Sequence, residues 1–359
     1  MEQVTAEENL LCALAVVNAS HRYYKGHRPN KTVLRIESDI PGAVRALRNI
    51  LTDYPSYYLV KPRISTRWDV NARKWRDIAE QPIWPDQYIY HAVIQVLQPV
   101  LMRGMDPFCC ASIKGRGTGY GRRHLEHWLK RDPKHTRYAG EGDIHHFYES
   151  LQPEIVMNRL RRLIKGREVL TLCERMMTYG VIAGAYFSQW FANTTLQELD
   201  CLIREDGAAH YYVRHMDNLT ILGSNKRKLH RLFQRIERWL REHKLRLKGN
   251  WQVFPLRSRW VAAFGYRYRH GITKLRKAKQ LCIRRQVRAY RRLRRVSAHF
   301  AASLISRLGM LKHCRHTRFY TAYIPARLQR RLKNIVRERM RKENAKWKLS
   351  TSSVTTAVP

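Results

Sequence analysis

Two isolated acidic residues stand where short β-prone runs end, and carboxylates in such positions can bind a divalent cation. In the segment Tyr211–Leu222, apolar runs flank Asp217-Asn218, which predicts a β-hairpin with an acidic tip. A second acid, Asp143, lies upstream in the stretch that leads to Tyr148. Mg²⁺ prefers hard oxygen ligands, and paired Mg²⁺ ions catalyse in-line phosphoryl transfer. Since Asp-Asn is also a common turn, the hairpin alone does not indicate a metal site.

These acids lie in separate segments, so rigid elements must bring them together. We expect a strand that ends at Asp143 and a hairpin tip that carries Asp217, with the peptide carbonyl of Ile144 as a further ligand. The amide oxygen of Asn218 can also ligate a cation, but without charge. The residues before Asp143, 139–142, include two glycines and are poor strand formers.

Hydrophobic periodicity places these segments in an α+β chain. Helical spacing predicts helices near Ile40–Leu51, Tyr88–Leu101, Leu151–Thr178, Phe187–Ile203 and Arg227–His243. Alternation predicts a two-stranded ribbon within Tyr57–Asp77 and short strands at Trp251–Pro255 and Trp260–Tyr268. From Lys274 to Lys348 the chain is basic and is expected to be helical throughout.

The charge of the chain indicates a polyanionic partner. Its 359 residues include 69 Lys and Arg against 28 Asp and Glu, a net charge of +41. From Arg241 onward there are 33 Lys and Arg residues against three acids. Ribosomal and histone-like proteins share this bias, so charge indicates nucleic-acid binding and not catalysis. The 44% hydrophobic content, with nine Trp and nineteen Tyr, favours a folded core over an electrostatic tail.

Cysteine usage and hydropathy favour a cytoplasmic protein. The seven cysteines show no Cys-x-x-Cys spacing, and Cys109 and Cys110 are adjacent, so we expect free thiols in a reducing compartment. No apolar run approaches the ~18 residues of a membrane span, and the acidic N-terminus does not resemble a signal peptide. We expect no membrane partner.

An ordered series of segments resembles the bacterial reverse transcriptases of diversity-generating retroelements and their close relatives. The segments are Arg76–His91, Ser112–Thr118, Asp143–Tyr148, Gly184-x-x-x-Ser188-Gln189, Arg214–Asn218, Lys248–Pro255, Phe264–Tyr266 and Leu311–Cys314. The resemblance covers about 10–325 and implies a right-hand polymerase. It divides the chain into N-terminal helices and fingers (1–84), a fingers and palm catalytic domain (85–270), a basic helical thumb (271–348) and a disordered tail (349–359).

The resemblance also implies roles for single residues. Asp143, Ile144 and Asp217 would hold two Mg²⁺ ions, with Mn²⁺ as an alternative, and Asn218 stands where a second acid is usual. The residues expected to bind the incoming dNTP are Lys74, Arg76, Tyr148, Ala183, Gly184, Ser188, Gln189 and Lys248. Tyr148 would exclude the 2′-hydroxyl, Arg76 would grip the triphosphate, and Lys248 would protonate pyrophosphate. Core packing for Tyr148 and plain surface exposure for Lys74 and Lys248 remain open alternatives.

The implied partners are a template RNA, the RNA/cDNA duplex and an accessory protein of the retroelement. The residues expected to contact nucleic acid are Lys114, Arg116, Lys274, Arg276, Lys277, Arg284, Arg285, Arg288, Arg291 and Arg292. Ala183 replaces the usual glutamine, which predicts error-prone copying. The resemblance therefore implies an RNA-directed DNA polymerase in a bacterium or phage. A phage-defence or intron-related reverse transcriptase, or a palm-fold RNA-binding protein with impaired catalysis, are the alternatives.

Overall fold

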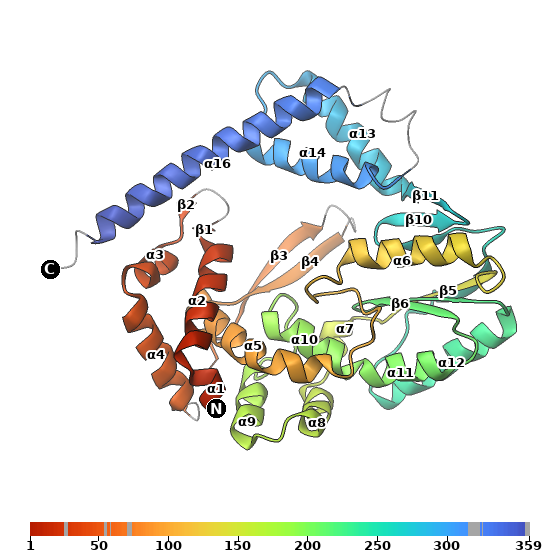
Figure 1. Cartoon of the computed structure of the whole chain (residues 1–359), viewed down its shortest axis with the longest axis horizontal. Helices are drawn as coiled ribbons and strands as arrows, with labels where there is room; N and C mark the ends of the chain where they lie inside the picture. The colour runs from red at the N-terminus through yellow and green to blue at the C-terminus, as the bar shows by residue number, and fades with distance from the viewer. Residues whose placement is uncertain are drawn as a thin grey trace.

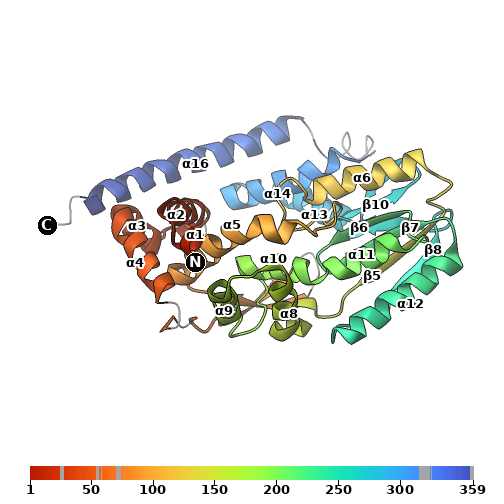
Figure 2. The same cartoon turned by 60° about the horizontal axis from the view of Figure 1, so that its bottom comes forward.

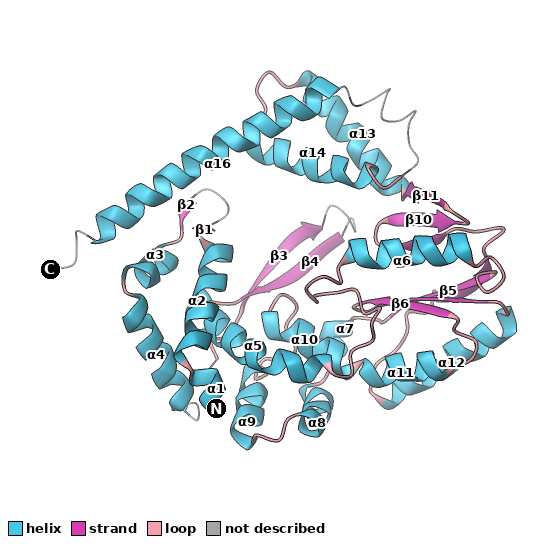
Figure 3. Ribbon diagram, viewed as in Figure 1, coloured by secondary structure: helices cyan, strands magenta, loops and turns pink. Residues whose placement is uncertain are grey.

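The described residues fold into an arrangement of helices around a four-stranded and a three-stranded antiparallel sheet and two two-stranded β-ribbons (Figure 1 and Figure 3). The computed structural model describes residues 1–24, 28–53, 56–57, 59–69, 74–314, 324 and 326–355. The helices are α1 (Glu2–Thr5), α2 (Glu7–His21), α3 (Lys31–Ser38), α4 (Ile40–Thr52), η2 (Ile83–Gln87, a π-helical turn), α5 (Tyr88–Met102), α6 (Thr118–Arg131), α7 (Phe147–Ser150), α8 (Pro153–Leu163), α9 (Arg167–Met176), α10 (Tyr186–Thr195), α11 (Gln197–Glu205), α12 (Lys226–Glu242), α13 (Lys277–Arg292), α14 (Ala298–Leu311) and α16 (Ala326–Thr355). The strands are β1 (Tyr23–Tyr24), β2 (Arg28–Pro29), β3 (Arg63–Asp69), β4 (Lys74–Glu80), β5 (Tyr138–Asp143), β6 (Tyr211–His215), β7 (Asn218–Gly223), β8 (Gln252–Pro255), β9 (Val261–Ala263), β10 (Tyr266–Arg269) and β11 (Ile272–Leu275).

The four-stranded sheet has the order β6-β7-β5-β8, with every neighbouring pair antiparallel. Strands β6 and β7 form the hairpin expected within Tyr211–Leu222, and β5 ends at Asp143 as expected. Successive residues of a strand face opposite sides of a sheet. Tyr212 and Ile221 therefore enter one hydrophobic cluster, whereas Val213 and Leu222 enter a second cluster on the other face.

Strand β5 forms despite its two glycines because the helix α12 packs against it at close range. A Cβ atom on Gly140 would lie 2.2 Å from the Phe233 ring, and one on Gly142 would lie 2.9 Å from it. The ring is fully buried and stacks on Trp251, with centroids 5.1 Å apart. Glycine therefore stands where the backbone itself is the packing surface.

Two predicted helices are each divided into two. The expected helix Leu151–Thr178 is interrupted between α8 and α9, where Gly166 caps the second helix and lowers the helix propensity. The expected helix Phe187–Ile203 breaks at Leu196. There the hydroxyls of Thr194 and Thr195 donate back to carbonyls four residues earlier, at 2.8 and 2.9 Å, which bends a helix.

The N-terminal third carries the ribbon predicted for Tyr57–Asp77, displaced a few residues towards the C-terminus as β3 and β4. It projects from the N-terminal helices, and Figure 1 shows it in the middle of the molecule, between α2 and α6. The predicted helices near Ile40–Leu51 and Tyr88–Leu101 appear as α4 and α5.

The C-terminal third corrects the expectation that everything after Lys274 is helical. Ile272–Leu275 is the strand β11, because it pairs with β10 through the β-branched Ile272 and Thr273. The sheet order is β11-β10-β9, and the helices α13, α14 and α16 follow it. Helix α16 packs along α14 and reaches α3, and its Glu343 carbonyl accepts from the Tyr23 hydroxyl of β1 (Figure 1 and Figure 2).

The predicted disordered tail, 349–359, is helical backbone as far as Thr355, because a helix already formed extends at little cost per residue. Residues 356–359 lie outside the described part of the chain. All seven cysteines are free, as expected. None of the helices that the structure describes combines the length and apolarity needed to cross a bilayer.

Candidate active site

The fold brings the two acids together. Asp143 at the end of β5 and Asn218 at the start of β7 are partners in the sheet register. The hairpin closes through a two-residue loop, Met216 and Asp217, in which Met216 adopts a positive φ of 54°. The Ile144 amide donates to the Asp217 carbonyl at 3.0 Å, which ties the hairpin tip to the end of β5. Both acids therefore lie on rigid elements that are bonded to each other.

Electrostatics at this point favour a cation. Burial raises the pKa of Asp217, and the neighbouring Asp143 carboxylate raises it further. The Asn218 side-chain amide donates to Asp217 Oδ1 at 3.0 Å. The Lys248 ammonium forms an ion pair with Asp143, and the Lys248 backbone amide donates to the Asp143 carbonyl at 2.8 Å. Two crowded, half-buried carboxylates repel each other, and a positive charge at this place relieves the repulsion.

The donor set suits a hard cation with water as a co-ligand. It consists of carboxylate, amide and carbonyl oxygens at Asp143, Asp217, Asn218 and Ile144, and Mg²⁺ commonly uses one or two carboxylates and keeps several waters. Within the described part of the chain, no group of three or more His, Cys, Asp or Glu side chains converges as a metal site. The arrangement therefore fits Mg²⁺ and does not resemble a zinc site.

A buried ion-pair network supports the hairpin from inside. Arg214 on β6 is fully buried and donates to both carboxylate oxygens of Asp200, at 2.8 and 2.6 Å. It also donates to Asn193 Oδ1 at 2.8 Å and to the Met216 carbonyl at 3.2 Å. Asp200 accepts a further bond from the Tyr212 hydroxyl at 2.7 Å. The network therefore links the loop that carries Asp217 to helices α10 and α11.

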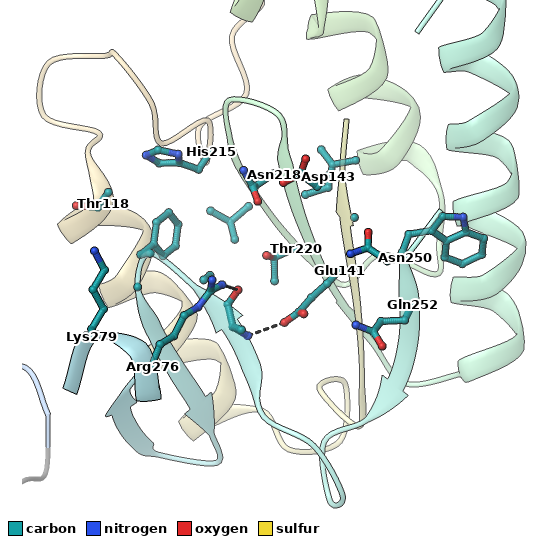
Figure 4. Close-up of a pocket in the computed structure, with 18 of the residues that line it drawn as sticks. Thr118, Glu141, Asp143, His215, Asn218, Thr220, Asn250, Gln252, Arg276 and Lys279 are labelled. Atoms are coloured by element: carbon teal, nitrogen blue, oxygen red, sulfur yellow. Dashed lines mark hydrogen bonds between the residues drawn. The ribbon is translucent and has the colours of Figure 1, made fainter. Parts of the chain in front are cut away.

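On one side, Asp143 and Asn218 border a cavity of about 430 Å³ between the four-stranded sheet, the three-stranded sheet and α13 (Figure 4). Asp143 and Asn218 lie side by side at one end, and Arg276 and Lys279 lie across the cavity from them. Glu141 lies between these ends and accepts from the Ala262 amide at 2.5 Å. Burial raises the pKa of the Glu141 carboxyl.

On the other side, a second cavity of about 650 Å³ lies under the β3–β4 ribbon. Tyr148 and Ala183 both line it, so the structure brings these two predicted nucleotide contacts together. The Tyr148 hydroxyl lies 4.0 Å from Met216 Sδ, beside the hairpin loop. Burial and the nearby Asp217 charge raise the Tyr148 pKa, so its hydroxyl stays protonated.

The other predicted nucleotide contacts are placed less uniformly. Gly184 has a φ of +106° and open space around it, so backbone conformation, and not crowding, requires glycine there. Ser188 is fully buried in α10, which excludes direct contact of its side chain with a ligand, whereas Gln189 is half-buried. Lys248 contacts Asp143, which makes it part of the acid cluster. The backbones of Lys74 and Arg76 lie in β4, and their side chains lie outside the described part.

The predicted nucleic-acid contacts fall into two groups. Lys114 is exposed, and Arg116 is half-buried with Nη1 3.3 Å from the Asp106 carbonyl. The others lie on β11, on α13 or, for Arg276, between them, and Ile283 and Val287 of α13 face the core. Their basic side chains are exposed or half-buried: Lys274, Arg276, Lys277, Arg284, Arg285, Arg288, Arg291 and Arg292.

Sequence reasoning assigned no role to Arg214 or Asp200. The signal available was an arginine inside an apolar strand, which requires a buried anionic partner, although nothing in the sequence identifies that partner. Glu141 lies in the segment 139–142, for which the sequence predicted only poor strand propensity, and its place in the cavity depends on the Ala262 amide of β9.

Comparisons with known proteins add little to this geometry. No protein-family model matches the chain, and no curated protein matches its sequence. Among solved structures, apo telomerase from Candida tropicalis has a TM-score of 0.48 and 12% identity, with 84% of this chain and 63% of that one aligned. Apo telomerase from Candida tropicalis truncated from its C-terminal domain has a TM-score of 0.46 and 13% identity, with 64% and 59% aligned. This chain thus spans less than two thirds of either neighbour.

Proposed function

We propose that the protein is an RNA-directed DNA polymerase that extends a primer by two-metal nucleotidyl transfer. The observation that supports this most strongly is the pairing of Asp143 with the hairpin of Asp217, where two carboxylates from separate segments meet beside two cavities. The order of the motifs along the chain supports the same reaction. The sheet and its acids would be the palm, the β3–β4 ribbon part of the fingers, and α13, α14 and α16 the thumb.

Asp143, Asp217 and the Ile144 carbonyl would hold two Mg²⁺ ions, which would activate the primer 3′-hydroxyl and neutralise the leaving pyrophosphate. The Asn218 amide, which donates to Asp217, fixes the orientation of that carboxylate. Tyr148 would close the cavity against a 2′-hydroxyl, with Ala183 beside it. Lys248 would exchange its partner Asp143 for a phosphate oxygen once that carboxylate binds a cation.

The template RNA and the RNA/cDNA duplex would lie against β11 and α13, with their phosphates facing the arginines of α13. Ala183 offers no polar group to the second cavity, which would relax base selection during copying. We assign the enzyme to a diversity-generating retroelement of a bacterium or phage, acting in the cytoplasm with an accessory protein.

The test is primer extension on an RNA template with dNTPs, in Mg²⁺ and then in Mn²⁺. Asp217→Asn changes one atom of the side chain and should abolish extension, whereas Asp53→Asn, at an exposed acid in another region, should leave it intact. Sequencing of the products tests for the excess misincorporation that relaxed base selection at Ala183 predicts. Equal extension by wild type and Asp217→Asn would overturn the proposal.

One observation favours a second function, a palm-fold RNA-binding protein without catalysis. Asn218 supplies no second charge, and the Lys248 ammonium already neutralises Asp143. RNA binding without incorporation in either metal would favour this reading. Extension that appears only in Lys248→Gln would show that the ion pair itself suppresses the metal site.

A further inference from the structure

The β3–β4 ribbon is held at its base and not along its length. Within the described part of the chain, its two strands pack extensively only against each other. Its large side chains are open to solvent, with Ile64 62%, Trp68 48% and Trp75 66% exposed. Burial of apolar surface therefore does little to fix the direction in which the ribbon projects. That direction must depend on the residues where the ribbon begins and ends.

A buried carboxyl lies where the ribbon joins the helices. Asp86 in η2 is fully buried, and the Tyr57 hydroxyl donates to its Oδ1. Tyr57 lies in the segment that leads into β3, and Asp86 lies in the segment that follows β4, so this bond links the two. Burial raises the pKa of the Tyr57 hydroxyl, which therefore stays protonated and remains a donor.

Further bonds hold each end of the ribbon to a helix. Gln81, the residue after β4, donates through Nε2 to the Tyr90 hydroxyl of α5 at 2.9 Å. Arg175 of α9 donates through Nη1 to the backbone carbonyl of Tyr57 at 3.1 Å. Because hydrogen bonds weaken steeply when they are bent or stretched, neither end of the ribbon can swing without a loss of bonding.

Helix α5 also supports one wall of the second cavity. The Tyr90 ring lies edge to face with the Phe187 ring of α10, with centroids 4.8 Å apart, and the His91 ring stacks on Tyr186 at 3.8 Å. Tyr186 and Phe187 begin α10, shortly after Ala183, which lines the second cavity. The ribbon lines the same cavity from its other side. The start of α5 therefore holds both walls at once.

A small change of angle at the base would move the ribbon by a functionally large distance. A strand rises about 3.4 Å per residue, so the backbone of Arg76 lies about 17 Å from Gln81 along β4. A rotation of about 10° at the base would then displace it by about 3 Å. Misplacement of a positioning group by about 1 Å can slow a reaction about a hundredfold. Bonds at the base therefore have a large effect on what the ribbon can contact.

We propose that Tyr57, Asp86, Gln81 and Tyr90 form a polar hinge that sets the angle of the β3–β4 ribbon over the second cavity, and so positions the ribbon for the incoming nucleotide. The four side chains are positioning residues, because they act through the ribbon. The inference rests on the proposed function in one respect only, namely that the ligand of the second cavity is a nucleotide. The hinge itself is a property of the fold.

The first experiment measures the position of the ribbon without any ligand. Spin labels on unnatural amino acids at the exposed positions Thr66 in β3 and Glu205 in α11 give the distance between ribbon and palm by pulsed EPR. Tyr57→Phe removes the hydroxyl that binds Asp86. The matched control, Tyr88→Phe, removes an equally buried hydroxyl from α5, whose partner at 2.7 Å is Asn18 of α2.

We expect one narrow distance distribution in wild type and in Tyr88→Phe, and a distribution broadened by about 3 Å or more in Tyr57→Phe. An unchanged distribution in Tyr57→Phe would overturn the proposal. If that variant does not fold, the double variant Tyr57→Phe, Asp86→Leu takes its place, since it leaves no unpaired carboxyl in the interior. The double variant also lacks the hinge bond and should show the same broadening, and a narrow distribution there would equally refute the hinge.

The second experiment separates positioning from stability. In primer extension, the loosened ribbon of Tyr57→Phe should raise KM for dNTPs about tenfold, while KM for the primer–template stays as in wild type. Tyr88→Phe should change neither constant. A broadened distance with an unchanged KM for dNTPs would refute the positioning role. A wild-type protein that extends no primer would refute the proposed function, whereas the EPR distances would still decide whether the hinge exists.

Discussion

The buried Arg214 network makes the sharpest prediction about what holds the acids in place. The change Arg214→Met keeps much of the side-chain volume but removes the charge. Asp200, only 1% exposed, would then keep the Tyr212 hydroxyl as its one remaining partner in the network. Removing one member of a buried ion pair costs about 3–5 kcal/mol, because the other charge stays buried and uncompensated. That is a large part of the ~5–15 kcal/mol that stabilises a typical domain.

This cost is measured by urea unfolding of the wild type, Arg214→Met, Asp200→Leu and the double variant. The same four proteins give the coupling free energy between Arg214 and Asp200. Each single change should lower the free energy of unfolding by about 3 kcal/mol or more. The double variant should be clearly less destabilised than their sum, since it leaves neither charge unpaired. A loss below about 1 kcal/mol in Arg214→Met, or additive losses, would refute the reasoning. In Arg214→Met the Met216 carbonyl also loses its hydrogen-bond donor, which loosens the loop that carries Asp217. Primer extension should therefore decline even where the variant remains folded.

Three further predictions concern residues around the sheet and the second cavity. Gly140→Ala places a Cβ atom 2.2 Å from the Phe233 ring and should cost about 1–3 kcal/mol in urea unfolding; an equal cost in a Phe233→Leu background would contradict this contact. Burial and the Asp143 charge raise the pKa of Asp217 in the folded state, so the folded chain binds a proton at pH values where the unfolded chain has lost it. The contribution of Asp217 to the free energy of unfolding therefore increases as the pH falls through the folded-state pKa. Asp217→Asn should remove this pH dependence of stability and stabilise the fold at neutral pH, while it abolishes primer extension. A variant less stable than wild type at pH 7 would count against repulsion between the Asp143 and Asp217 carboxylates. Tyr148→Ala should lower the preference for dNTPs over rNTPs in kcat/KM by about tenfold or more, and an unchanged ratio would assign Tyr148 to packing alone.

The elements that carry the acids were predictable because their signals are local. The alternation around Asp217 and the turn residues are sufficient to predict β6 and β7, and the apolar stripe of α12 predicts that helix. The ribbon was predicted in kind but not in position, since its strands run over Arg63–Asp69 and Lys74–Glu80 and not from Tyr57.

The parts that could not be predicted depend on contacts between distant segments. The glycines of β5 contradict strand propensity, and only the approach of Phe233 from α12 explains them. The partner of Arg214 lies on α11, and no spacing rule connects the two. Likewise Ser188 shares a motif with exposed residues, yet the packing of α10 buries it completely. The residue types of the candidate site were visible in the sequence, whereas the burial of Ser188 and the ion pair that supports the hairpin were not.

Helix α16 joins segments that are far apart in the sequence, because it packs along α14 and also against α3. The hydrogen bond from the Tyr23 hydroxyl to the Glu343 carbonyl adds to this second contact. Local opening of a packed contact costs less free energy than global unfolding. Amide hydrogen exchange in α3 and α16 would then report how often the C-terminal helix leaves the N-terminal helices while both remain folded.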